Sequence, residues 1–249
     1  MTMEQELAQA LEAVRSAHFD AGGTACDYTA FTASREHGRV AACLAGLDSF
    51  DPKQVRFGAQ TAFWINVFNA GVLRDCAELA LLSGERDREP FFERPRLKVA
   101  GHAFSLDDIY HGLLRGNLPK HGHLRAPMSR ADPRLVYMPI AFDERMHLAL
   151  HTAARSSPSL RAFEGGKLDV QLEEAAADYI QRTSRVERDG ARVVAPKLLH
   201  WYAKDFGGEN GVLAFVLGRL DDASVDLADR HRGSEKLRYA DFDWRLNLR

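Results

Sequence analysis

The segment AQTAFWINVFNAGVLRDCAELALL, residues 59–82, is the most informative stretch of the sequence for the fold. Its apolar residues recur at the spacing of one helical face: Phe63, Val67, Ala70 and Leu73. Such a stripe predicts a helix that packs its apolar face against a core. Ser83 and Gly84 follow the segment and predict the end of the helix.

Two asparagines lie inside this apolar helix. Asn66 and Asn69 are three residues apart and therefore share one helix face. Asparagine is unfavourable in a helix interior because its side chain competes for backbone hydrogen bonds. Two of them among phenylalanine, tryptophan, isoleucine and valine indicate a specific role, either in a polar network or in the lining of a pocket.

The rest of the chain predicts further helices and a few strands. Helical periodicity and breaks predict helices at residues 4–18, 34–47, 167–181, 196–206 and 209–220, and one that starts at Ser105 with Asp108 completing a capping box. Hairpins are predicted at residues 97–104 and 185–194, the second around Asp189-Gly190. Regular alternation predicts a strand at residues 145–151, and residues 116–133 predict a long loop.

These elements predict an α+β fold: one mostly helical domain, residues 1–249, around a small antiparallel sheet. No linker separates two hydrophobic halves of the sequence. The tail carries Tyr239, Phe242 and Trp244, so we expect it to dock on the core.

The composition is that of a globular protein, with 45% hydrophobic and 27% charged residues. The 33 basic and 35 acidic residues give a net charge of −2, which argues against nucleic-acid binding. The apolar runs are too short for a membrane helix, and the first residues lack the basic-then-apolar pattern of a secretory signal. We therefore expect a cytoplasmic protein that does not bind membranes.

The sequence predicts no metal site, disulfide or cofactor. Cys26, Cys43 and Cys76 have neither zinc-site nor disulfide-framework spacing, and dinucleotide, nucleotide-triphosphate and zinc-protease motifs are absent. His147 and His151 would lie roughly 13 Å apart on a strand, too far to share an ion.

Residues 145–161 form the richest candidate site. The predicted strand places Arg145 and His147 on one face, and the loop after it carries Thr152, Ser156 and Ser157. A histidine near a hydroxyl is the minimum arrangement for acyl transfer. The same residues also fit an ordinary serine-rich turn beside a hydrogen-bonded core histidine.

A second candidate set consists of polar residues that lie among apolar neighbours on predicted helices. Its members are Asn66, Asn69, His111, Arg115, Trp201 and Asp205. Buried polar groups need partners, so we expect these side chains to meet. The sequence leaves open whether they form a structural network or line a binding pocket.

Five motifs resemble those of the domain of unknown function 547 family, in the order that family has them. They are FWINVFNA at residues 63–70, HGLLR at 111–115, DERMHLAL at 143–150, WYAKDFG at 201–207 and YADFDWRLN at 239–247. The resemblance covers roughly residues 28–247, and the chain is identified as a member on these motifs.

The family resemblance implies a thiol site that this chain lacks. The family's usual phrase after its H-F-A-L motif is C-G-A-x-S-C-P-x-L-R, and a cysteine that follows a histidine resembles papain-like or transglutaminase-like hydrolases and acyltransferases. Thr152 and Ser157 stand at the two cysteine positions. A hydroxyl has a far higher pKa than a thiol and needs stronger activation. The resemblance therefore implies a retained pocket with altered or lost chemistry.

Two functions follow from the resemblance. The first is a hydrolase or acyltransferase, with Ser157 or Thr152 as nucleophile, His147 as base, and Asn66 and His111 as orienting or oxyanion groups. The second is a non-catalytic relative that binds a small molecule, a peptide-like ligand or a protein partner in the same pocket. A purely structural role would instead require an exposed apolar patch.

Overall fold

Helices make up most of the structure, a computed structural model that describes residues 1–78, 88–187, 192–221, 224 and 236–249. The α-helices are α1 (Met3–His18), α2 (Tyr28–Thr32), α3 (Arg35–Gly46), α4 (Gln60–Glu78), α5 (Arg88–Glu93), α6 (Leu168–Thr183), α7 (Lys197–Trp201) and α8 (Glu209–Leu217). Short 3₁₀ helices lie at Leu47–Ser49, Pro52–Gln54, Phe57–Ala59, Pro133–Tyr137, Glu144–Leu148, Gly165–Lys167 and Ala203–Phe206, and a π-helix at Asp108–Leu114. The strands are β1 (Leu97–Val99), β2 (His102–Phe104), β3 (Arg185–Val186), β4 (Arg192–Pro196) and β5 (Lys236–Ala240).

The central helix is α4, as the sequence predicts. Every residue from Ala62 to Leu73 is buried, because α1, α2, α3 and the π-helix all pack against α4. The helix is therefore enclosed on all sides rather than on one stripe. The predicted end of this helix at Ser83-Gly84 lies outside the described residues.

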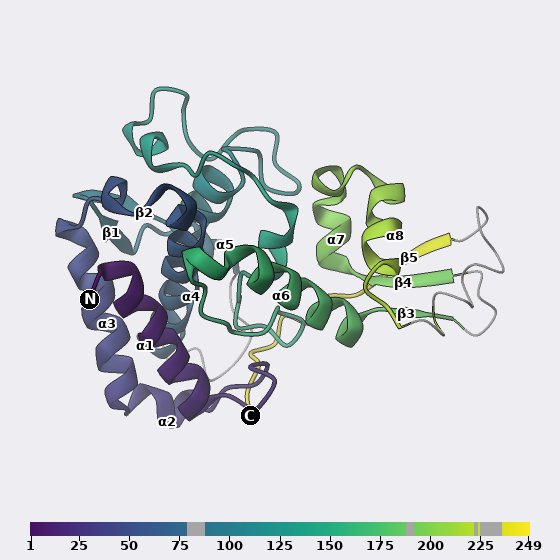
Figure 1. Ribbon diagram of the computed structural model, residues 1–249, viewed down its shortest axis with the longest axis horizontal. Coiled ribbons are helices and arrows are strands. Elements are labelled where there is room, and N and C mark those ends of the chain that lie inside the picture. The colour runs from purple at the N-terminus through teal and green to yellow at the C-terminus, as the bar shows by residue number, and fades with distance from the viewer. Residues whose placement is uncertain (79–87, 188–191, 222–223, 225–235) are drawn as a thin grey trace.

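Figure 1 shows α1, α2 and α3 at one end of the molecule and α7, α8 and the β3–β4–β5 sheet at the other, with α6 between them. The helices predicted at residues 4–18, 34–47, 167–181 and 209–220 are confirmed, each with ends within three residues of the prediction. The capping box is also confirmed, since Ser105 N donates to Asp108 Oδ2 at 2.9 Å and Asp108 N donates to Ser105 Oγ at 2.9 Å.

The predicted small antiparallel sheet is correct only in part. The hairpin β1–β2 is antiparallel, and so is β3–β4, whose predicted turn at Asp189-Gly190 lies outside the described residues. However, β4 also pairs with β5 in parallel, from Arg192 opposite Lys236 to Pro196 opposite Ala240. A parallel pair needs a long crossover, and the chain that includes α7 and α8 provides it.

The predicted strand at residues 145–151 is wrong. Residues Glu144–Leu148 form a 3₁₀ helix, and the Asp143 side chain caps it by accepting a hydrogen bond from Arg145 N at 2.9 Å. All residues from Met146 to His151 are buried. The alternation in the sequence therefore does not separate a buried face from an exposed one; the polar residues are buried with partners of their own.

The predicted helix at residues 196–206 is divided into two. Pro196 ends β4, α7 stops at Trp201, and a 3₁₀ helix follows from Ala203 to Phe206. Tyr202 breaks the helix, with φ −116° and ψ 24°. Trp201 and Asp205 consequently do not share a face of one helix.

Asn66 and Asn69 bind the backbone of the segment that follows the 3₁₀ helix Glu144–Leu148. Asn66 donates to Phe163 O at 2.7 Å and accepts from Phe163 N at 2.9 Å. Asn69 donates to Ala149 O at 3.1 Å and accepts from His151 N at 2.8 Å. A side-chain amide has one donor and one acceptor group, so each asparagine pairs with the segment much as a peptide group of a strand would.

The C-terminal tail docks on the core, as predicted. Asn247 N donates to Ala153 O at 3.1 Å, and Cys26 N donates to Asn247 O at 2.9 Å. Tyr28 OH donates to Asn247 Oδ1 at 2.8 Å. The tail therefore lies against the same segment that Asn69 holds.

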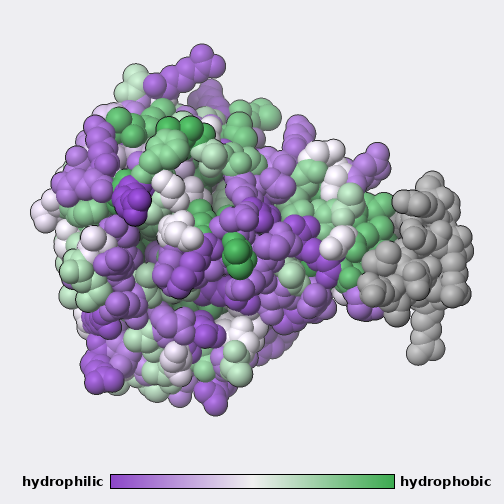
Figure 2. All heavy atoms as spheres, in the orientation of Figure 1, coloured by the Kyte–Doolittle hydropathy of each residue, from purple (hydrophilic) through white to green (hydrophobic). Residues whose placement is uncertain are grey.

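The surface has an apolar strip that runs from the 3₁₀ helix Pro133–Tyr137 to the start of the 3₁₀ helix Glu144–Leu148. It exposes four large side chains: Val136, Met138, Ile140 and Phe142. Hydrophobic side chains gather on the upper part of the face shown in Figure 2. No helix within the described residues is long and apolar enough to cross a membrane.

Replacing Asn69 with alanine should reduce the free energy of unfolding by about 3 kcal/mol, because the buried Ala149 carbonyl and His151 N–H would both lose their partner. Urea denaturation of Asn69→Ala measures this loss. Asn210→Ala is the control, because Asn210 is exposed and should give a change below about 0.5 kcal/mol. Equal stabilities for the two variants would contradict a bridging role for Asn69.

Candidate functional site

A buried ion pair joins the π-helix to the 3₁₀ helix after α7. Arg115 binds Asp205 with two nitrogens, Nε at 2.5 Å from Oδ2 and Nη2 at 3.0 Å from Oδ1. The two side chains are 9% and 6% exposed. Their burial means that each charge depends on the other, since an unpaired buried charge is costly. Residues 90 positions apart in the sequence are thereby fixed to each other.

His147 completes this network between Asp205 and Tyr110. Its Nε2 lies 2.9 Å from Asp205 Oδ2, and its Nδ1 lies 2.7 Å from the Tyr110 hydroxyl. Asp205 is a carboxylate and can only accept, so Nε2 carries the proton and donates. Nδ1 then accepts from Tyr110, and both nitrogens of the His147 ring are occupied.

The charges of the network follow from burial and hydrogen bonding. Burial lowers the pKa of His147, despite the opposing effect of Asp205, so the imidazole is neutral. Burial alone would raise the pKa of Asp205, but the hydrogen bonds from His147 and Arg115 outweigh it and lower the value to about 2. Burial raises the pKa of Tyr110 well above its ordinary value, so its hydroxyl keeps the proton that it donates.

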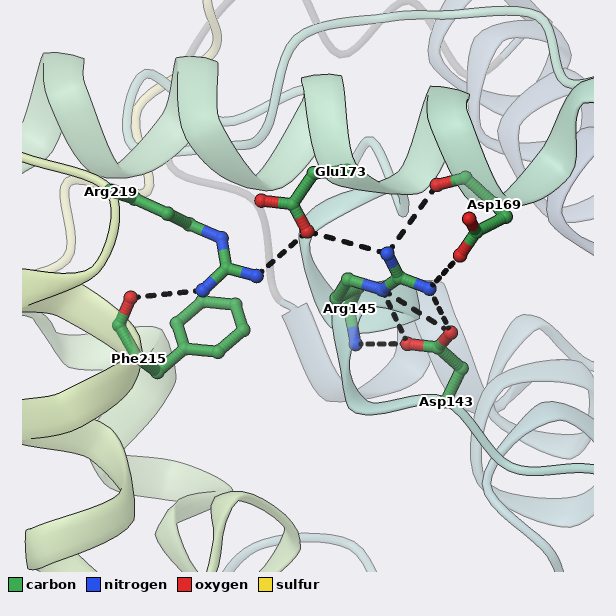
Figure 3. Close-up of polar contacts among 6 residues, drawn as sticks. All are labelled: Asp143, Arg145, Asp169, Glu173, Phe215 and Arg219. Carbon is green, nitrogen blue, oxygen red and sulfur yellow. Dashed lines mark hydrogen bonds and ion pairs between the residues drawn. The ribbon is translucent and has the colours of Figure 1, made fainter.

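Arg145 belongs to a different network, shown in Figure 3. Its Nη2 contacts Asp143 Oδ2 at 2.7 Å and Asp169 Oδ1 at 2.6 Å, and its Nη1 lies 3.3 Å from Glu173 Oε2. Glu173 also accepts from Arg219 at 2.8 Å. These contacts tie the 3₁₀ helix Glu144–Leu148 to α6 and to the chain after α8. Arg145 therefore stabilises the scaffold and does not line the cavity described next.

Beside the Tyr110–His147–Asp205 network lies a cavity of about 380 Å³, which we call the aromatic cavity. Its lining is Phe68, Phe92, Asp107, Tyr110, His111, Lys120, His121, Thr152, Trp201, Tyr202 and Trp244. The volume is within the range of small-molecule sites. Ring stacking holds the walls in place: His147 stacks on Tyr202 with centroids 4.3 Å apart, and Trp201 stacks on Trp244 with centroids 5.6 Å apart.

His111 is the buried histidine in the lining of the aromatic cavity, which also includes the exposed His121. Its ring stacks on Tyr110 with centroids 4.2 Å apart, and its Nε2 lies 3.8 Å from Asp107 Oδ1. Among the described residues, its buried Nδ1 has no hydrogen-bond partner. Burial, together with the positive charge of Arg115, lowers the pKa of His111 well below its ordinary value. His111 is therefore a neutral residue of the cavity lining, and its buried Nδ1 has no partner among the described residues.

The two hydroxyls at the family's cysteine positions lie in different places. Thr152 lines the aromatic cavity, whereas Ser157 is buried outside it. Ser157 Oγ accepts from Thr152 N at 2.8 Å, donates to Pro158 O at 3.0 Å, and lies 3.3 Å from His151 Nδ1. The structure thus does not bring His147 and Ser157 together as base and nucleophile, because each is already bound to other groups.

The second candidate set separates into three groups. Arg115 and Asp205 meet in the ion pair, while His111 and Trp201 line the aromatic cavity. Asn66 and Asn69 bind backbone elsewhere. The expected polar network and the expected pocket therefore both exist, side by side, with different members.

Sequence reasoning missed several residues of the site. Tyr110, Tyr202 and Trp244 supply its rings, and Asp107 and Lys120 supply a charged pair with Nζ 2.8 Å from Oδ2. Tyr202 directly follows Trp201 in the motif WYAKDFG at residues 201–207, and this motif could have indicated Tyr202 as a site residue. No spacing in the sequence indicates that residues 110 and 202 meet.

Comparison with known proteins gives one finding. A family model described as "Protein of unknown function, DUF547" matches residues 52–180, just over half of the chain. The matched region contains α4, the π-helix, His147 and Thr152, while Trp201, Asp205 and the tail lie beyond it. No curated protein and no solved structure matches the chain.

Replacing Asp205 with asparagine should destabilise the protein by about 3 kcal/mol at neutral pH, because Arg115 would lose its buried counter-charge. The pKa of Asp205 is lowered by folding, so its carboxylate stabilises the native state above about pH 4, and this contribution disappears as the pH falls toward about 2. The difference from wild type should therefore shrink by about 2 kcal/mol over that window.

Urea denaturation at steps from about pH 5 to about pH 2 measures this difference. Asp241→Asn serves as the control, since Asp241 is exposed. A gap between wild type and Asp205→Asn that stays constant with pH would contradict the assignment of an ionised, buried Asp205.

Proposed function

We propose that this chain, which belongs to the DUF547 family of proteins of unknown function, binds a small molecule in the aromatic cavity without transforming it. The observation that carries the proposal is a cavity walled by aromatic rings and lined by the buried His111, whose Nδ1 has no hydrogen-bond partner among the described residues. A buried polar atom without a partner is costly, and a ligand group that binds it removes that cost.

The side chains that line the aromatic cavity indicate which kind of ligand it would bind. Trp201, Trp244 and Tyr202 offer flat apolar surfaces that suit a planar apolar body. His111 offers one hydrogen bond, which fixes the orientation of such a body. The positions of His147 and Ser157 also support binding over catalysis, because their polar atoms already form hydrogen bonds within the protein.

The planar probe 2-naphthol, with one hydroxyl, tests this proposal by isothermal titration calorimetry. Wild type should bind it, and Trp201→Ala should weaken binding by about tenfold through loss of a stacking wall. His111→Gln should weaken it by about fivefold through loss of a neutral hydrogen bond. Phe57→Ala, at an exposed phenylalanine outside the cavity, should leave the affinity unchanged. Absence of binding, or equal affinity for wild type and Trp201→Ala, would refute the proposal.

A second candidate function is acyl transfer or hydrolysis at Thr152. It is favoured by the fact that Thr152 and His111 line the same cavity, at a position where the family resemblance implies a cysteine. The Thr152 hydroxyl would attack a carbonyl carbon and its proton would pass to His111, which would return that proton to the departing alcohol or amine as its bond to the carbonyl carbon breaks; water or another acceptor would then release the acyl group from Thr152. The low pKa of His111 makes it a weak base, which places this candidate second. A papain-like or transglutaminase-like relationship would accompany this chemistry.

Hydrolysis of 4-nitrophenyl acetate separates the two candidates. If Thr152 is a nucleophile, Thr152→Val should abolish protein-dependent hydrolysis, and Thr152→Cys should accelerate it by about tenfold because a thiolate forms more readily. Wild-type and Thr152→Val proteins that hydrolyse the ester at the same rate would remove this second candidate.

A further inference from the structure

A second cavity of about 230 Å³, which we call the polar cavity, adjoins the aromatic cavity. Its lining is Glu93, Ser105, Asp107, Asp108, His111, Lys120, His123, Arg125 and Pro127. Three of these residues, Asp107, His111 and Lys120, also line the aromatic cavity. The two spaces are therefore neighbours that share these three lining residues.

The acidic groups of the polar cavity already have cationic partners. Lys120 Nζ lies 2.8 Å from Asp107 Oδ2 and 3.7 Å from Glu93 Oε1. Arg134 Nη1 lies 2.8 Å from Asp108 Oδ2. Because these ion pairs neutralise the carboxylates, the cavity has little net negative charge with which to bind a cation.

Arg125 differs from the other charged residues of the polar cavity. Within the part of the chain that the structure describes, no carboxylate forms an ion pair with it. The surrounding segment, residues 109–131, contains several basic residues and no aspartate or glutamate. Arg125 and the neighbouring His123 are therefore the groups of this cavity that are available to an anion.

His111, which both cavities share, is an uncharged group beside two cations. Burial lowers the pKa of His111, and the positive charges of Arg115 and Lys120 lower it further.

We propose that the two cavities together bind one elongated carboxylic acid, with its planar apolar body in the aromatic cavity and its carboxylate at Arg125 and His123. Binding of the apolar body in the aromatic cavity rests on the proposed function, whereas binding of the carboxylate at Arg125 and His123 is a new inference. A carboxylate matches the two-nitrogen fork of arginine.

Three probes with one body and different head groups test the inference: 2-naphthylacetate, 2-(2-naphthyl)ethanol and 2-(2-naphthyl)ethylammonium. Calorimetry at low ionic strength, where exposed charges are least screened, should show 2-naphthylacetate binding about tenfold more tightly than the alcohol. The ammonium compound should bind more weakly than the alcohol.

Two arginine variants assign the effect to the polar cavity. Arg125→Gln should make 2-naphthylacetate bind no more tightly than the alcohol. Arg130→Gln is the matched control, because Arg130 is exposed in the same loop but lines neither cavity, and it should preserve the preference.

The outcomes distinguish this inference from the proposed function. Equal binding of the three probes, tighter binding of the ammonium compound, or a preference for the acetate that survives Arg125→Gln would overturn the carboxylate site and leave the aromatic cavity as a binding site. Absence of binding by all three probes would overturn both. The alcohol's affinity should be the same in Arg125→Gln as in wild type, which shows that the variant remains folded.

Discussion

The buried carboxylate of Asp205 is the constraint on which the site depends. It accepts from Arg115 on one side and from His147 on the other, so it joins the π-helix, the 3₁₀ helix Glu144–Leu148 and the turn after α7. Three segments far apart in the sequence must converge before any of these groups is satisfied. Because Tyr110, His111 and Tyr202 belong to the same segments, the Asp205 contacts also position the rings that wall the aromatic cavity.

Asn66 and Asn69 provide the second part of the framework. Through their hydrogen bonds to the backbone, α4 holds residues 149–163 in a largely buried, irregular path. This path places Thr152 at the cavity and Ser157 away from it. Asn66 and Asn69 thus position the segment that carries Thr152 without lining the cavity. His111 and the aromatic rings line the cavity itself.

Periodicity predicted the helices well, since α1 and α6 obey the spacing rules that local sequence can express. It failed at residues 145–151, where the alternating polar side chains of Arg145, His147 and His151 mimic a half-exposed strand. The parallel pairing of β4 with β5 was also inaccessible, because it depends on a crossover rather than on a local pattern. At the site, the expectation that buried polar residues find one another holds for Arg115 and Asp205, but only tertiary contacts reveal that His111, and not His147, lines the cavity.

The most direct test of the account is nitrogen-15 NMR of the histidine rings while 2-naphthol is added. The account predicts that the ring-nitrogen resonances of His111 change and saturate, whereas those of His147 stay fixed because Tyr110 and Asp205 occupy both of its nitrogens. His111→Gln and His147→Gln spectra assign the two sets of signals. A change at His147 with none at His111 would contradict the account.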